Sequence, residues 1–139
     1  MTRHFIVAFA CLLCSLTNVS ADITPVTMVQ LIATPEKYEG RHVRVIGFLH
    51  LEFEGNVLYL HREDYDHAIV GNGIWVELGR DNQKLSDKYV LLEGVFTAKE
   101  HGHMGMWSGA LKDINRSMIW SSTEELRSQQ NSVPLKPRK

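Results

Sequence analysis

Apolar and polar residues alternate along much of the chain after Arg41, and a period of two is typical of β-strands that bury one face. The longest alternating run extends from Arg41 to Phe53, and the residues at 54–56 then predict a hairpin turn. Its apolar face is formed by Val43, Val45, Gly47, Leu49, Leu51 and Phe53. Further apolar runs, separated by polar or glycine-rich stretches, predict strands at 57–61, 74–78, 89–98 and 106–114. The pattern therefore predicts five strands.

Two glycines interrupt the predicted strands. Gly47 lies in the middle of the first strand and Gly94 in the middle of the fourth. Glycine weakens a flat strand, but it suits a sharp bend or a bulge. Five short, bent strands around one core predict an all-β protein with a short N-terminal helix, in the form of a five-stranded OB-like barrel. An SH3-like barrel or a small open sandwich is the alternative.

The N-terminal helix is predicted from apolar residues at helical spacing. Met28 and Leu31 recur at this spacing, and Thr24 is the predicted N-cap, with Pro25 at the first helical position. The helix should end at residues 34–35, because a residue before proline is pushed out of the helical conformation.

After Ile114 the alternation fades. Ser122 and Glu125 have the spacing of a capping box, which predicts one more short helical turn. Residues 131–139 contain prolines and basic residues but no acid, which is typical of a disordered tail. We therefore place the barrel and its N-terminal helix in residues 22–120, and the helical turn and tail in residues 121–139.

Residues 1–21 have the features of a signal peptide. Arg3 provides a positive charge, an apolar stretch follows from Phe5 to Leu16, and Val19 and Ala21 are small residues placed for cleavage after Ala21. Cleavage would remove both cysteines and leave no transmembrane segment, so thiol chemistry is excluded from the mature chain. The predicted location is the periplasm or the extracellular space. A buried N-terminal helix and a lipoprotein anchor are the alternatives.

Two segments resemble parts of a known family. Residues 35–47 read PEKYEGRHVRVIG, and residues 89–96 read YVLLEGVF. A helix that ends in a tyrosine-x-glycine turn, followed by a strand that reaches a glycine, resembles the opening of a bacterial exported OB-fold group labelled tRNA-anticodon-like. The second segment resembles that group's later strand ending in glycine. The resemblance spans most of residues 35–114 and implies the OB-fold and export, but no catalytic residues and no defined function.

Composition limits the possible functions. The chain has 139 residues, of which 44% are hydrophobic and 22% charged, as is typical of one globular domain. Its net charge of −1 provides no positive field that would attract nucleic acid. OB barrels bind single strands by stacking bases on exposed aromatic side chains, but we expect Phe48, Tyr59, Trp75 and Trp107 to lie in the core. We therefore expect no nucleic-acid partner.

Two polar stretches contain the densest candidate chemistry. One is residues 61–67 and the other is residues 101–107. Side chains two residues apart in an extended segment point the same way, so the two histidines of the second stretch can face one ligand. We expect a binding surface on the barrel face bounded by the 62–73 and 99–105 connections. Its predicted ligand-binding residues are His61, Asp64, Trp75, His101 and His103.

The favoured function is a small exported binding module, without catalysis or a cofactor, that docks an unknown ligand or a protein segment in the cell envelope. The alternative is a periplasmic protein that binds copper or zinc. Imidazole is a ligand for both metals and thioether sulfur suits Cu(I). The predicted metal ligands are His101, His103, Met104 and Met106. A hydrolase would need a nucleophile elbow or an opposed acid and base, and the sequence provides no such motif.

Overall fold

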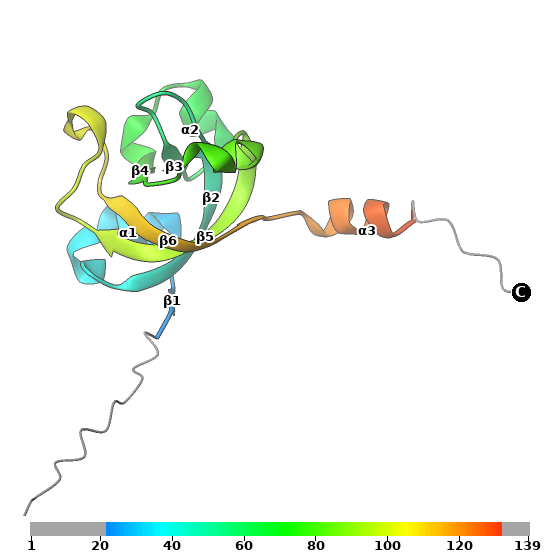
Figure 1. Cartoon of the computed structure of the whole chain (residues 1–139), viewed down its shortest axis with the longest axis horizontal. Helices are drawn as coiled ribbons and strands as arrows, with labels where there is room; N and C mark the ends of the chain where they lie inside the picture. The colour runs from blue at the N-terminus through cyan, green and yellow to red at the C-terminus, as the bar shows by residue number, and fades with distance from the viewer. Residues whose placement is uncertain (1–21, 132–139) are drawn as a thin grey trace, which may run out of the picture.

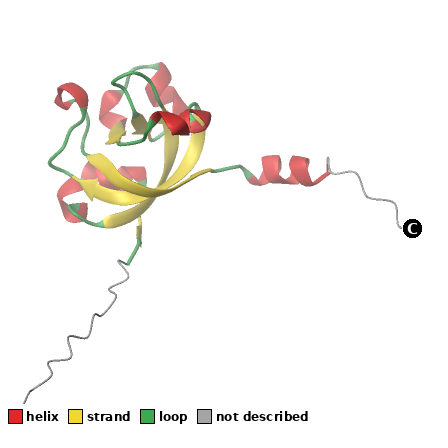
Figure 2. Ribbon diagram, in the orientation of Figure 1, coloured by secondary structure: helices red, strands yellow, loops and turns green. Residues whose placement is uncertain are grey.

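The computed structural model describes residues 22–131, so the predicted signal peptide at 1–21 and nearly all of the predicted tail lie outside the described residues. Strands dominate the described chain, and several short helices connect them (Figures 1 and 2). The strands are β1 (Thr24–Pro25), β2 (His42–His50), β3 (Val57–Tyr59), β4 (Gly73–Val76), β5 (Lys88–Thr97) and β6 (Ala110–Ile119). The α-helices are α1 (Met28–Ala33), α2 (Arg62–Asp66) and α3 (Thr123–Asn131). The 3₁₀-helices are η1 (Pro35–Tyr38), η2 (Val70–Asn72), η3 (Arg80–Leu85) and η4 (His103–Gly105).

Five strands close into a barrel. The sheet order is β1-β2-β3-β4-β6-β5, and β5 also pairs with β2, which completes the ring. β2 and β5 are antiparallel over a long register, whereas β4 and β6 are parallel. Figure 1 shows β2, β5 and β6 as long strands that curve across one side. The predicted mostly-β chain with a five-stranded barrel and a short N-terminal helix is confirmed.

The barrel encloses the main hydrophobic core. α1 contributes Met28 and Leu31 to it, and both side chains are fully buried. The strands contribute the other large, fully buried side chains, among them Val43, Val45, Leu49, Leu58, Ile74, Val90, Leu92, Phe96 and Leu111. These residues face inward at alternate positions, as the period of two predicted.

The two strand glycines lie where the backbones of neighbouring strands come closest. A Cβ atom on Gly47 would lie 2.6 Å from the Tyr59 carbonyl oxygen, and one on Gly94 would lie 2.5 Å from the Lys112 carbonyl oxygen. The pairing of β5 with β6 also shifts register between Glu93 and Val95. Gly94 therefore lies at a bulge of the barrel wall, as predicted, whereas Gly47 is required by the close approach of β3.

The predicted start of the N-terminal helix is wrong by one turn. Thr24 and Pro25 form β1, which pairs in parallel with Val43 and Arg44. The helix begins at Met28 with Thr27 as its N-cap: the Gln30 N–H donates to Thr27 Oγ1 at 3.2 Å, and the Thr27 N–H donates to Gln30 Oε1 at 2.9 Å. This reciprocal capping box satisfies two backbone donors at the true start.

Other boundaries also differ from prediction: β3 ends at Tyr59 rather than at 61, β4 spans Gly73–Val76 rather than 74–78, and β6 continues to Ile119 rather than ending at 114. The connection at 62–73 contains α2 and η2, and the connection at 79–88 contains η3. The last strand begins at Ala110 rather than at 106, because Gly102, Met104 and Gly105 all have positive φ and keep the preceding segment curled. β2 ends at His50, so Phe53 stands at a hairpin tip and is 82% exposed instead of facing the core.

A second hydrophobic cluster covers the outer side of β2, β3 and β4. Its buried members are Phe48, Val57, Tyr59 and Trp107, and the half-buried Tyr65 and Trp75 pack against it. Tyr65 comes from α2 and Trp107 from the segment before β6, so these two connections cover the sheet. Three of the four aromatic residues expected in the core are thus buried, and Trp75 is half-buried.

The C-terminal helix α3 follows the end of β6 (Figure 1), and Ser122, Glu125 and Ser128 line a cavity of about 630 Å³ together with barrel residues such as Phe48 and Tyr89. Its start follows the predicted capping box: the Ser122 N–H donates to Glu125 Oε2 at 2.7 Å, and the Glu125 N–H donates to Ser122 Oγ at 3.1 Å. Between residues 22 and 131, no helix is long and apolar enough to cross a membrane.

Candidate functional site

The structure brings three of the five predicted site residues together at one end of the barrel. Trp75, His101 and His103 line a cavity of about 440 Å³. The other lining residues are Glu54, Glu100 and Gly102. We call this cavity the loop-end pocket, because the β2–β3 hairpin and the β5–β6 connection form its walls around a residue of β4.

The other two predicted residues lie elsewhere. His61 lines a groove of about 370 Å³ with Val26 and Ile46, between the N-terminal segment and β2. Asp64 is buried and has a structural role. Its carboxylate accepts hydrogen bonds from the His61 N–H at 2.8 Å and from Asn72 Nδ2 at 2.7 Å, so it caps α2 and fastens η2.

Trp75 is packed tightly on the floor of the loop-end pocket. Gly102 lies against its indole: a Cβ atom at this position would approach the Trp75 ring to 2.6 Å. The Trp107 ring also contacts it, 5.3 Å away centroid to centroid and tilted by 51°. Gly102 has φ 63° and ψ −161°, a backbone conformation essentially restricted to glycine. The glycine between the two histidines is therefore required by both contact and conformation.

The two histidines are held differently. His101 Nδ1 lies 2.8 Å from the Trp107 carbonyl oxygen. Because a carbonyl oxygen only accepts, Nδ1 carries the hydrogen in this bond, and Nε2 of the neutral ring keeps its lone pair. His103 Nε2 lies 3.9 Å from Glu54 Oε2 across the pocket mouth. Thus one imidazole is oriented by backbone and the other is adjacent to a carboxylate.

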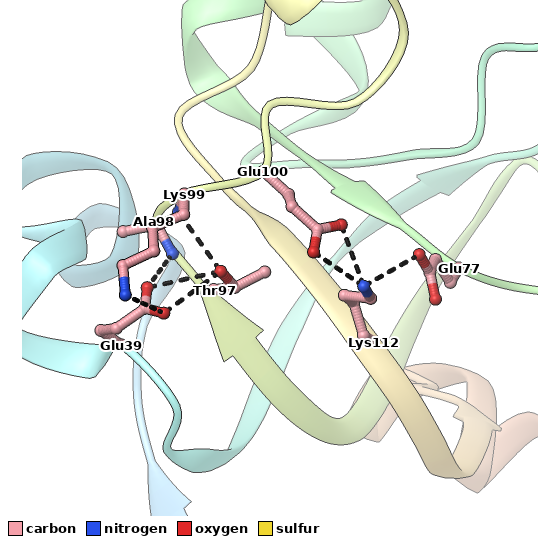
Figure 3. Close-up of polar contacts among 7 residues, drawn as sticks. All are labelled: Glu39, Glu77, Thr97, Ala98, Lys99, Glu100 and Lys112. Atoms are coloured by element: carbon pink, nitrogen blue, oxygen red, sulfur yellow. Dashed lines mark hydrogen bonds and ion pairs between the residues drawn. The ribbon is translucent and has the colours of Figure 1, made fainter.

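Two polar clusters anchor the ends of the β5–β6 connection, as Figure 3 shows. At its start, Glu39 Oε2 accepts the Ala98 N–H at 2.6 Å, and Lys99 Nζ lies 3.6 Å from Glu39 Oε1. At its end, Lys112 Nζ donates to Glu100 at 2.8 Å and lies 3.6 Å from Glu77. The bond to Glu100 and the charges of both carboxylates raise the pKa of Lys112. Both clusters therefore fix the residues directly before the two histidines, 98–100, against η1 and β6.

The sequence prediction missed the acidic hairpin tip. Glu52, Phe53 and Glu54 form it, and all three line a second cavity of about 640 Å³ together with Leu78 and Gln83. Glu54 thus lines both cavities, and the tip presents an exposed phenyl ring between two carboxylates. An acid–aromatic–acid triplet next to a predicted turn was the signal available in the sequence.

A histidine at the base of this hairpin was also missed. His50 Nδ1 lies 2.7 Å from Asp87 Oδ1, its Nε2 lies 3.7 Å from Glu52 Oε2, and its ring stacks on Tyr65 at 3.9 Å. Partial burial, followed by the nearby Glu52 and Asp87 charges, raises the pKa of the Tyr65 hydroxyl. This contact set ties the hairpin to α2 and to the start of β5.

Metal binding by the β5–β6 connection would depend on its methionines. In the described part of the chain, no group of three or more His, Cys, Asp or Glu side chains is placed to hold a metal ion. Met104 and Met106 are both exposed. A copper site here would therefore combine the two imidazoles with thioether sulfur, the softer ligand that Cu(I) accepts.

The loop-end pocket combines aromatic, acidic and imidazole side chains. Aromatic and glycine surfaces form its floor, while two carboxylates and two imidazoles surround its mouth. Its electrostatic balance is set by Glu54, because Glu100 is already paired with Lys112. Comparison of the chain with protein-family models finds no match, and comparison with curated proteins finds none either.

Proposed function

We propose that this protein is an exported OB-type binding module, acting in the periplasm without catalysis, and that its ligand docks in the loop-end pocket. The observation that carries the proposal is the convergence of Trp75, His101 and His103 with an acidic hairpin tip at one end of a closed barrel. The features of residues 1–21 support export.

Strand order supports the OB-type assignment. Counted from β2, the barrel strands follow the order 1-2-3-5-4 and close back to 1, with the third and fifth parallel. In OB-folds the loops between the first two and the last two strands flank the ligand. Here these loops are the Glu52–Glu54 hairpin tip and the β5–β6 connection, which form the pocket walls.

The ligand class follows from the charges and apolar surface. The hairpin tip has two carboxylates, both more than half exposed, and they flank the exposed Phe53 ring. Met104 is a second exposed apolar side chain, in the β5–β6 connection. A cationic and partly apolar ligand, such as a basic segment of an envelope protein, complements this surface. Because the β5–β6 connection is already anchored, little conformational entropy is lost when a ligand binds, and this favours affinity.

The test uses two short peptides as probes, one of lysine and leucine and one of glutamate and leucine. We expect the basic peptide to shift the NMR signals of Trp75, Gly102 and Phe53 in the exported protein, and the acidic peptide to leave them unchanged. Glu54→Gln should weaken binding of the basic peptide at least several-fold, because it removes the pocket carboxylate that is not paired with a lysine. Glu36→Gln, exposed on η1, is the matched control. Equal shifts with both peptides, or none with either, would contradict the proposal.

A metal-binding function is the second candidate, favoured by the free Nε2 lone pair of His101. It is tested by titrating Zn²⁺, Cu²⁺ and Cu⁺ and following mass and melting temperature. A metal function predicts a bound ion that is lost in the His101→Ala and His103→Ala double variant. No mass change and no shift with any of the three ions would remove this candidate.

A further inference from the structure

The strand β6 has a free edge. β4 pairs with β6 only at Ala110 and Leu111, whereas β5 pairs with β6 as far as Ile119. Within residues 22–131, no strand lies on the other side of β6 beyond Leu111. Figure 1 shows α3 beyond the end of β6, and α3 lines a cavity with Phe48, Arg62 and Tyr89, which belong to β2, α2 and β5. Unpaired edge backbone is a template for another strand.

The ladder with β5 determines which backbone groups are free. The Trp120 N–H donates to the Tyr89 carbonyl oxygen at 2.8 Å. Hydrogen-bonded and non-hydrogen-bonded pairs alternate along an antiparallel ladder, so Met118 also turns its N–H and C=O toward β5. Ser117 and Ile119 turn theirs outward. These two residues therefore provide the donors and acceptors that a further strand would use.

Three rows of side chains cross the outer face next to this edge. Each row contains one residue from β2, one from β5, and one from β6 or the residue after it. The strand registers give the rows Arg44–Glu93–Arg116, Ile46–Leu91–Met118 and Phe48–Tyr89–Trp120. Met118, in β6, is 41% exposed, and Trp120, directly after the end of β6, is 48% exposed. The free edge thus carries an arginine, a methionine and a tryptophan at alternate positions.

A buried carboxylate positions the arginine of this edge. Arg44 Nε lies 2.6 Å and Arg116 Nη1 lies 3.1 Å from Glu93 Oε1. Burial alone would raise the pKa of Glu93, but the hydrogen bond and charge of Arg44 and the charge of Arg116 outweigh it and lower the pKa. Arg116 Nη2 also lies 3.5 Å from Met118 Sδ. Its guanidinium is therefore held at the edge, beside the methionine.

We propose that β6 pairs antiparallel with β6 of a second copy of this chain, with Met118 on the two-fold axis. Ser117 then opposes Ile119 of the second copy, so the outward backbone groups meet as hydrogen-bonded pairs. Met118 opposes Met118 of the second copy in a non-hydrogen-bonded pair, where side chains lie closest. Arg116 lies opposite Trp120 of the second copy, and a guanidinium against an indole is favourable. The axis repeats each contact, as a closed dimer requires.

Other occupants fit this edge less well. A register with Arg116 on the axis would bring two arginines face to face, which is unfavourable. Residues 132–139 of the chain contain Pro134 and Pro137, which lack the N–H that an added strand must donate, and their basic residues would meet Arg116. An acidic and apolar peptide of another protein remains as the competing occupant, and the experiment separates it from a second copy.

The first measurement is the mass of the exported protein by analytical ultracentrifugation over a concentration series. We expect a reversible monomer–dimer equilibrium. Met118→Lys and Met118→Glu should each weaken the dimer about tenfold or more, because like charges would meet at the axis. An equimolar mixture of the two variants should restore the dimer, because lysine then faces glutamate. Val29→Lys and Val29→Glu, at a 57% exposed position of α1, are the matched controls and should keep the dimer.

A second measurement needs no variant. Amide hydrogen exchange at Ser117 and Ile119 should slow as protein concentration rises, while exchange at Val29 should stay constant. A single-chain mass at every concentration would overturn the proposal and leave the acidic peptide as the occupant. Dimers that persist in both Met118 variants, or a mixture that stays monomeric, would overturn the register. The loop-end pocket lies on other residues, so these outcomes do not bear on the peptide-binding proposal.

Discussion

Replacement of Gly102 by alanine tests the architecture of the loop-end pocket directly. The new methyl group would approach the Trp75 ring to 2.6 Å, a distance that real Cβ atoms do not adopt. It would also force alanine into φ 63° and ψ −161°. Gly105→Ala is the matched control in the same connection, because Gly105 has φ 69° but a methyl group there would meet nothing within 4 Å. The pair of variants therefore separates steric contact from backbone strain.

The expected magnitude is the sum of these two costs. A glycine-only backbone conformation costs other residues about 1–3 kcal/mol. Overpacking by one methyl group costs about 1–3 kcal/mol more, and Trp75 can yield only in part because Trp107 packs on it. We expect Gly102→Ala to lower the free energy of unfolding by about 2–6 kcal/mol, while Gly105→Ala should lower it by about 1–2 kcal/mol from left-handed strain alone.

The assay combines urea unfolding with near-ultraviolet circular dichroism. The signal from the adjacent Trp75 and Trp107 rings should change in Gly102→Ala and stay unchanged in Gly105→Ala. Binding of the lysine–leucine peptide should weaken only in Gly102→Ala. If both variants lose the same stability and keep the tryptophan signal, then Gly102 does not pack on Trp75, and the reasoning about the pocket floor is refuted.

Three further predictions concern the barrel and its C-terminal helix. Gly47→Ala should cost about 1–3 kcal/mol in urea unfolding because its methyl would lie 2.6 Å from the Tyr59 carbonyl oxygen, while Gly71→Ala, with open space around it, should stay within about 0.5 kcal/mol of the parent. The folded-state pKa of Glu93 lies below 4.5, so Glu93 stabilises the fold above pH 4.5, and this stabilisation is lost as the pH falls through the folded pKa. Glu93→Gln should therefore reduce the fall in the free energy of unfolding between neutral and acid pH. An unchanged pH dependence would refute the arginine–carboxylate row. Ser122→Ala should cost α3 about 1 kcal/mol by removing its capping box, seen as lost helical circular dichroism, and a fall in the barrel's melting temperature would show that α3 packs on it.

Local rules were sufficient where the controlling contacts lie within a few residues. The capping box from Ser122 to Glu125 depends on a spacing of three residues, so the sequence predicted it. The same rule placed the first helix one turn too early. Thr24 has the right residue type for an N-cap, but it lies in β1 because it pairs with Val43 of β2, which is distant in the sequence. Thr27, with Gln30 to complete the box, took the role instead.

The period of two and the strand glycines determined the barrel from the sequence alone, because alternating burial is imposed on each strand by the core it faces. Only the tertiary structure decided which candidate residues meet. Loops that follow different strands come close to one another only when the barrel closes. Closure therefore places Trp75 in one pocket with His101 and His103, while His61 lines a different groove. Closure also left Phe53 exposed at a tip and β6 with a free edge, since both depend on where pairing partners end.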